Sequence, residues 1–86
     1  MSIYNEIHLR RKPIADAMYE LDKYLNDVFL AKLDAVKEIH GKGSGQMREA
    51  VWDVLAEHPL VRDYRLAYPG EGDAGVTIVY MENLEK

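Results

Sequence analysis

The sequence has no cysteine, so the chain carries neither a disulfide framework nor a thiolate metal site. No stretch approaches the ~20 consecutive apolar residues that a membrane-spanning helix needs, and we expect no membrane partner. The first residues lack the basic and then apolar pattern of a secretory signal, which favours a soluble, cytoplasmic protein. An initial Met1 with no linker before it favours a free-standing protein.

The chain is also short of positive charge. It has 11 Lys and Arg against 15 Asp and Glu, a net charge of −4, which argues against a protein that coats nucleic acid through a general positive field. Any contact with phosphate therefore needs a local basic patch. With 86 residues, 48% of them hydrophobic, the chain has enough apolar sequence for one core, and we expect a single domain over 1–86 with its core at about 6–80.

Apolar residues follow the spacing of a helix in some segments and of a strand in others. Ile14, Ala17 and Leu21 recur on one helix face, whereas residues 76–81 (VTIVYM) are typical of a strand. Glu38 stands in a predicted strand where an aliphatic residue is preferred, which indicates that one face of the sheet is open to solvent. The predicted order is βαβαββ, with strands at 3–9, 35–40, 60–68 and 76–81 and helices from 14 to about 30–32 and from about 46 to 58.

The order of elements restricts the topology, because strand-helix-strand crossovers between parallel strands are almost always right-handed. We expect the first three strands to run parallel, both helices to cover one face, and the last strand to return antiparallel from the third. This is an α/β fold, a two-layer α+β sandwich with a four-stranded mixed sheet. The loops after the first three strands then emerge at one end, where open α/β sheets bind ligands.

Basic and glycine-rich segments converge at that predicted end. Three basic residues follow the first strand, and the sequence HGKGSG (40–45) leads into a helix whose first N–H groups and dipole attract anions. We therefore predict a site for a nucleic-acid backbone. The predicted binding residues are Arg10, Arg11, Lys12, Gly41, Lys42, Gly43, Ser44, Gly45 and Arg48.

Other residues near this end have a functional and a plainer interpretation. Glu71 and Asp73 are weak candidate ligands for Mg²⁺ or Mn²⁺, although surface turns often carry acidic residues for solubility alone. His40 either contributes to the site or packs under the loop, and His8 is expected to be a half-buried strand residue. Trp52, on the flank of the helical core stripe, either covers the edge of the core or marks a partner surface.

The glycine loop fits neither of two common phosphate-binding motifs. A Walker loop needs two glycines separated by four residues before Lys and Ser/Thr, and a dinucleotide fingerprint needs G-x-G-x-x-G with an acidic residue about 20 positions later. The loop has G-x-G-x-G spacing, and Arg65 stands where the acidic residue would be.

Three segments together closely resemble the Smr domain, the small MutS-related domain: HGKGSG (40–45), HPLV (58–61) and YRLAYPGEGDAGVTIV (64–79). The resemblance extends from about Glu6 to Val79. It implies the fold of the C-terminal domain of translation initiation factor three, and work on nucleic acid. Smr domains occur at the C-terminus of a recombination-suppressing MutS paralogue and as free-standing proteins, several of which nick DNA or cut RNA. The matched motif positions are Leu9, Arg10, His40, Gly41, Gly43 and Gly45.

The first motif departs from the family pattern. It usually reads Leu-Asp-Leu-His/Arg-Gly, whereas residues 7–11 here read Ile-His-Leu-Arg-Arg, so His8 replaces the acidic residue implicated in cleavage and Arg11 replaces the glycine. Phosphodiester cleavage needs a base, a metal ligand or a group that orients water, so the change puts cleavage in doubt but not binding. His8 and His40 are a candidate acid/base pair, with Arg10 neutralising charge on the phosphate.

Three functions remain open from the sequence. The chain is an Smr-type endonuclease that hydrolyses phosphodiesters through His40, Arg10 and Lys42, or a non-catalytic domain that binds branched DNA or ribosomal RNA through the same end. The third alternative is a protein-interaction module that uses Trp52 and the open sheet face. Nucleic-acid binding with endonuclease activity is the preferred hypothesis, and contacts to the backbone would give it little sequence specificity.

Overall fold

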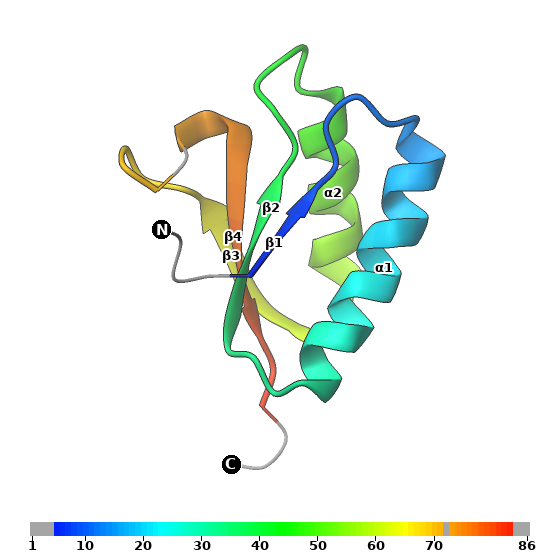
Figure 1. The fold of residues 1–86 in the computed structure, drawn as a ribbon, viewed down its shortest axis with the longest axis vertical. Coiled ribbons are helices and arrows are strands. Elements are labelled where there is room, and N and C mark those ends of the chain that lie inside the picture. The colour runs from blue at the N-terminus through cyan, green and yellow to red at the C-terminus, as the bar shows by residue number, and fades with distance from the viewer. Residues whose placement is uncertain (1–4, 72, 84–86) are drawn as a thin grey trace.

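The structure, a computed structural model, describes residues 5–71 and 73–83 as two layers (Figure 1). The βαβαββ order is confirmed, and a short 3-10 helix (Asp73–Gly75) precedes the last strand. The strands are β1 (Asn5–His8), β2 (Ala35–Ile39), β3 (Val61–Leu66) and β4 (Val76–Met81), and the helices are α1 (Ile14–Leu30) and α2 (Gln46–Glu57). The first three strands are shorter than predicted; the predicted residues 3 and 4 of β1 lie outside the described residues.

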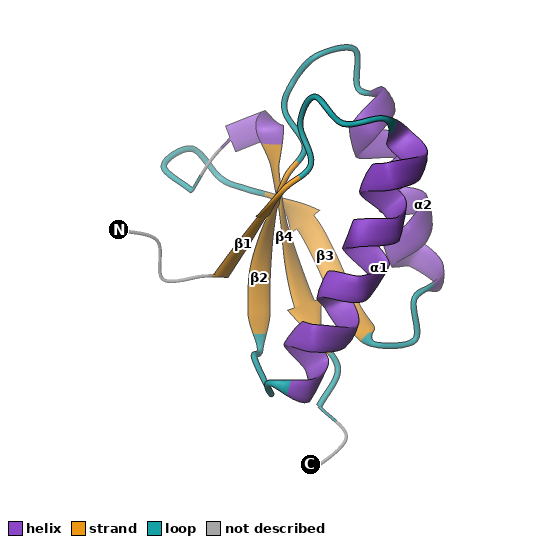
Figure 2. Cartoon of the chain, turned by 45° about the vertical axis from the view of Figure 1, so that its right-hand side comes forward, coloured by secondary structure: helices purple, strands orange, loops and turns teal. Residues whose placement is uncertain are grey.

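The sheet has the strand order β1-β2-β4-β3. β1 pairs with β2 in parallel, and β4 is antiparallel to both β2 and β3, so the first three strands share one direction as predicted. β4 lies between β2 and β3, an insertion that the order along the chain does not specify. The ends of β1 and β2 and their following loops gather at the end of the sheet where both helices begin (Figure 2).

Both helices cover one face of the sheet, as predicted, and the core fills the space between the layers (Figure 1). α1 buries four residues at helical spacing and α2 buries Val51 and Leu55. Full burial of such aliphatic side chains contributes roughly 1.5–3 kcal/mol each. α2 ends at Glu57 because His58, which precedes Pro59, is extended with φ −79° and ψ 123°. None of the described helices is long and apolar enough to cross a membrane.

Glu38 does not lie on the open face of the sheet. Side chains alternate along β2, and Glu38 shares its face with Val36, which belongs to the core beneath the helices. Glu38 is fully buried, and neither of its carboxylate oxygens has a hydrogen-bond partner among the described residues. Burial therefore raises its pKa to about 8. The prediction that Glu38 marks a solvent-exposed face of the sheet is therefore wrong. The helices do leave the other face uncovered, but Glu38 does not lie on it.

The neighbouring Tyr24 reinforces this interpretation. Its hydroxyl is buried without a described hydrogen-bond partner, and its pKa is raised to about 12 by its own burial and by the charge of Glu38. An ionised Glu38 carboxylate would lose its hydration without gaining a hydrogen bond or an ion pair among the described residues. Glu38 is therefore protonated in the folded protein near neutral pH.

We predict that replacing Glu38 with Gln stabilises the protein progressively more as pH rises. The folded-state pKa of about 8 lies above the ordinary value of 4.5, so folding binds a proton between these two pH values. The wild type therefore loses stability relative to Glu38→Gln across that window, by at most about 1.4 kcal/mol per pH unit. Urea unfolding of both proteins at pH 5, 6, 7 and 8 measures the difference. A constant difference would show that Glu38 is ionised in the folded state.

Candidate functional site

The segment after β1 and the loop after β2 come together at one end of the sheet. The side chain of Arg10 lies along Gly41, where an added Cβ would stand 3.4 Å from the Cγ and Cδ atoms of Arg10. A hollow of about 220 Å³ opens between this segment and the start of α2, and we call it the glycine-loop hollow. It is lined by Lys12, Ile14, His40, Gly41, Lys42, Gly43, Ser44, Gly45, Gln46, Met47 and Arg48.

Two glycines give the loop its path. Gly41 has a φ of +82° and Gly45 a φ of +88°, values that other residues rarely adopt. Gly45 caps α2, and its carbonyl accepts the first intrahelical bond from the Glu49 amide (2.9 Å). The preceding amides of the first turn have no acceptor within the helix. The loop therefore presents backbone donors and the positive end of a helix dipole to the hollow.

His40 is held by a chain of hydrogen bonds beneath the loop. The Trp52 indole N–H donates to Thr77 Oγ1 (2.9 Å), and Thr77 Oγ1 lies 2.8 Å from His40 Nε2. His40 Nδ1 lies 2.9 Å from the Gly41 carbonyl, which can only accept. In the neutral ring the proton is therefore on Nδ1, and Nε2 accepts from the Thr77 hydroxyl.

Several effects set the protonation of His40. Burial lowers its pKa below the ordinary value; the bond to the Gly41 carbonyl opposes this, and the charge of Arg48 adds to it. The ring is therefore neutral at pH 7, and both of its nitrogens are engaged. The structure assigns His40 the role of holding the loop, in agreement with the plainer of its two interpretations.

The backbone fastens the same loop to β4. The carbonyl of Gly75 accepts hydrogen bonds from the amides of His40 (3.1 Å) and Gly41 (2.9 Å). Thr77, two residues later, supplies the hydroxyl that bonds His40. The GVT sequence and the HGKGSG sequence, far apart in the chain, are thus one structural unit.

The structure separates His8 from His40. Ile7 packs against the core, so His8, the next residue in β1, points to the opposite face of the sheet. Its side chain is 67% exposed and lies 3.4 Å from Glu6, so it is not the half-buried residue that we expected. His40 lies on the helix-covered side, bonded to Thr77. The expected acid/base pair is therefore not assembled.

The basic residues after β1 differ in their surroundings. Lys12 forms an ion pair with Glu20 (2.8 Å), whereas Arg10 is exposed and forms no ion pair with a carboxylate among the described residues. Arg11 has a φ of +64°, in the left-handed region. That conformation costs a non-glycine residue roughly 1–2 kcal/mol, which explains why the family pattern has glycine at this position.

Glu71, the acidic candidate whose side chain the structure describes, does not line the glycine-loop hollow. Glu71 forms an ion pair with Arg65 (2.9 Å) and accepts a hydrogen bond from the Tyr68 amide, and these contacts lower its pKa. The side chain of Asp73 lies outside the described part of the structure. In the part that is described, no three His, Asp or Glu residues are grouped as metal ligands would be.

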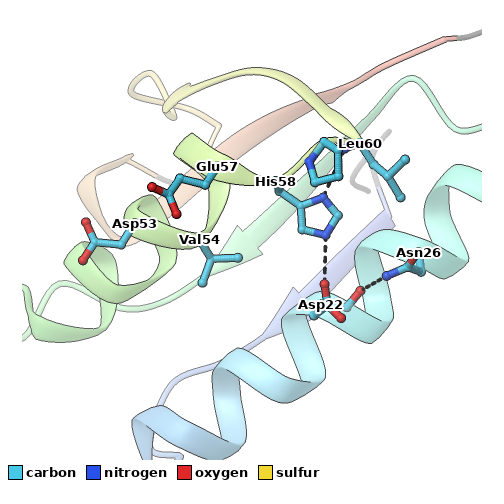
Figure 3. Close-up of a pocket in the computed structure, with 8 residues that line it drawn as sticks. Asp22, Asn26, Asp53, Val54, Glu57, His58 and Leu60 are labelled. Carbon is cyan, nitrogen blue, oxygen red and sulfur yellow. Dashed lines mark hydrogen bonds and ion pairs between the residues drawn. The ribbon is translucent and has the colours of Figure 1, made fainter.

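A second hollow, of about 610 Å³, lies between the helices near the end of α2 (Figure 3). His58 Nε2 is 2.9 Å from Asp22 Oδ1, so this histidine joins the end of α2 to α1. Asp22, Asp53 and Glu57 line this hollow, and their negative charge disfavours phosphate. The smaller glycine-loop hollow is therefore the candidate site.

We predict that the Thr77 hydroxyl stabilises the fold through two buried partners. Thr77→Val keeps the shape but leaves His40 Nε2 without a donor and the Trp52 N–H without an acceptor, which should lower the free energy of unfolding by about 2 kcal/mol. Thr77→Ser, which keeps the hydroxyl, should lower the free energy of unfolding by less than Thr77→Val does. Urea unfolding at pH 7 compares the three proteins. Stability that is unchanged in Thr77→Val but lowered in Thr77→Ser would assign the effect to the methyl group instead of the hydroxyl.

Comparison with known proteins identifies relatives of this chain. Endonuclease MutS2 of Thermomicrobium roseum is 47% identical over 77 residues, which are 90% of this chain and 10% of that protein. Endonuclease MutS2 of Clostridium tetani is 43% identical over 81 residues, 94% of this chain and 10% of that protein. The chain therefore spans about a tenth of the length of these relatives.

Two solved structures share the fold. The crystal structure of the Smr domain of Thermus thermophilus MutS2 has a TM-score of 0.89 and 34% identity, and covers 92% of this chain and 99% of its own. YdaL, a stand-alone small MutS-related protein from Escherichia coli, has a TM-score of 0.87 over 95% of this chain and 67% of its own, at 24% identity. The Smr domain family itself matches residues 7–82. The chain belongs to the Smr domain family.

Proposed function

We propose that this Smr domain binds the sugar-phosphate backbone of nucleic acid in the glycine-loop hollow. The observation that supports the proposal is the composition of this hollow: Lys12, Lys42 and Arg48 line it together with the first turn of α2. Cations, backbone amides and a helix dipole all favour an anion, and the polymer that offers regularly spaced anions is nucleic acid.

The cations that line the glycine-loop hollow contrast with the net negative charge of the chain. The net charge is −4, so the chain as a whole repels a phosphate, and a local group of cations such as that of the basic loops is needed to attract it. Arg10 and Arg48 have no described carboxylate partner, whereas the charge of Lys12 is partly offset by Glu20. Arg10 and Arg48 should therefore contribute most to binding.

We predict that affinity for a DNA duplex, a four-way junction and an RNA hairpin falls steeply with salt. Arg10→Ala and Arg48→Ala should each weaken binding at low salt and reduce the slope of log Kd against log salt by about one, with a smaller effect for Lys12→Ala. Fluorescence anisotropy between 50 and 300 mM salt, concentrations on the order of those where such slopes are usually resolved, measures both quantities.

Arg62→Ala is the matched control for this titration. Arg62 is exposed at the start of β3, at the other end of the sheet, so its loss changes the net charge equally without touching the hollow. If Arg62→Ala weakens binding as much as Arg10→Ala, the attraction is a general charge effect and the proposed site is wrong. Comparison of the three ligands also distinguishes branched DNA from ribosomal RNA as the preferred partner class.

A second candidate function is phosphodiester cleavage, which the name of the MutS2 relatives, endonuclease, favours. Arg10, beside the glycine loop, and Lys42, within it, carry positive charge that would neutralise charge on a phosphate as it is attacked, which supports this candidate. The His8–His40 acid/base pair is not part of this proposal, because the two side chains lie on opposite faces of the sheet.

We predict nicking of supercoiled plasmid or cutting of a labelled RNA hairpin that is lost in Arg10→Ala and kept in His8→Ala. The reactions are run with Mg²⁺, with Mn²⁺ and with chelator, so that dependence on a divalent ion is measured directly. A cleavage rate that is the same in Arg10→Ala and the wild type would mean that the activity belongs to a contaminant. His40→Ala is a poor control, because it also removes the bonds that hold the loop.

A further inference from the structure

A third hollow adjoins the glycine loop on the side of β3. It has a volume of about 500 Å³ and is lined by Arg48, Glu49, Trp52, Asp53 and Leu66; we call it the Trp52 hollow. Arg48 lines both this hollow and the glycine-loop hollow, so the two share this residue as a common wall. β3 is an edge strand of the sheet, and within residues 5–71 and 73–83 no further strand lies beyond it.

The indole ring of Trp52 is fixed before any ligand arrives. Its N–H donates to Thr77 Oγ1 (2.9 Å), and the ring of Tyr64 packs against it edge to face, with centroids 4.9 Å apart and planes at 78°. The polar atom of the indole is thus used inside the protein, and Trp52 remains half-buried beside the hollow. A rigid aromatic ring is a suitable platform for a flat apolar ligand, because little conformational entropy is lost on stacking.

The charges around the Trp52 hollow suit a nucleobase and not a phosphate. Glu49 and Asp53 repel phosphate, but their carboxylates accept hydrogen bonds from the exocyclic amino groups of bases. Arg48 and Trp52 are four residues apart on α2 and so lie next to each other on its surface. A nucleotide can therefore place its phosphate at Arg48 and its base at Trp52.

We propose that the Trp52 hollow is a base subsite that takes one unpaired nucleobase with an exocyclic amino group. This inference rests on the proposed function and narrows its substrate class to nucleic acid that contains an unpaired base, in a single strand, a bulge or a junction. A base stacked within a duplex is not accessible to such a hollow. Fully paired DNA uses only the glycine-loop hollow.

The fluorescence of Trp52 tests the proposal directly, because it is the single tryptophan of the chain. DNA hairpins that differ at one position are titrated into the wild type: a bulged cytosine, a bulged thymine, an abasic site, or a fully paired stem. We expect quenching with the bulged cytosine, weaker quenching with thymine, and none with the abasic or paired hairpin. The bulged cytosine should also bind about tenfold more tightly than the abasic hairpin.

Variants on α2 test the two parts of the subsite. Glu49→Ala and Asp53→Ala should remove the preference for cytosine over thymine, whereas Glu57→Ala, on the same helix but outside this hollow, should keep it. Trp52→Leu should lose the advantage of the bulged base. Because this variant also loses the bond to Thr77, the quenching of the wild type remains the primary measurement.

The outcomes separate the two proposals. Quenching by the abasic or the paired hairpin, or hairpins that bind with the expected salt dependence but never quench Trp52, would overturn the base subsite and leave the backbone site intact. If no hairpin binds, both proposals fail. Quenching that requires the unpaired base, with a cytosine preference that Glu49 and Asp53 supply, supports the subsite.

Discussion

The glycine loop has its shape because hydrogen bonds fasten it to β4. The Gly75 carbonyl accepts hydrogen bonds from two amides of the loop. The Thr77 hydroxyl accepts a hydrogen bond from the Trp52 N–H and donates one to His40. His40, Gly75 and Thr77 are buried and Trp52 is half-buried, so an unmade bond among them would cost desolvation energy. These bonds fix the path of the loop, and the position of Gly41 beside the Arg10 side chain depends on that path. A binding site on a flexible glycine loop would first have to order that loop.

Charge is distributed unevenly among the hollows of the described structure. The glycine-loop hollow combines cations with the first turn of α2, whereas the hollow near His58 is bordered by carboxylates and the end of the same helix. The Trp52 hollow is lined by one cation, Arg48, and by two carboxylates, Glu49 and Asp53. An acidic protein can in this way attract a polyanion at one end and repel it elsewhere, which favours one orientation of binding over general adhesion.

Glu38 and the two histidines of the predicted site show why residue type alone does not predict which face of the sheet a side chain lies on. A glutamate within a strand favours a solvent-exposed sheet face. Side-chain alternation from Val36 nevertheless places Glu38 in the core, where burial keeps it protonated. His8 and His40 both belong to the predicted end, but His8 pairs with Ile39 across the two strands, and His40, the residue after Ile39, faces the opposite side of the sheet. The sequence contained that alternation; which face the helices cover was decided by packing.

Periodicity in the sequence was enough to determine the elements and their order, because helical and strand spacings depend only on neighbouring residues, and the handedness of crossovers then predicted that both helices lie in one layer. The motifs were enough to determine the family and the end of the sheet where basic and glycine-rich loops meet. Tertiary structure alone decided that β4 lies between β2 and β3, that Gly75 and Thr77 hold the loop, and that Trp52 borders a hollow shared with Arg48. Those contacts join residues far apart in the chain, and only the folded sheet brings their atoms within bonding distance.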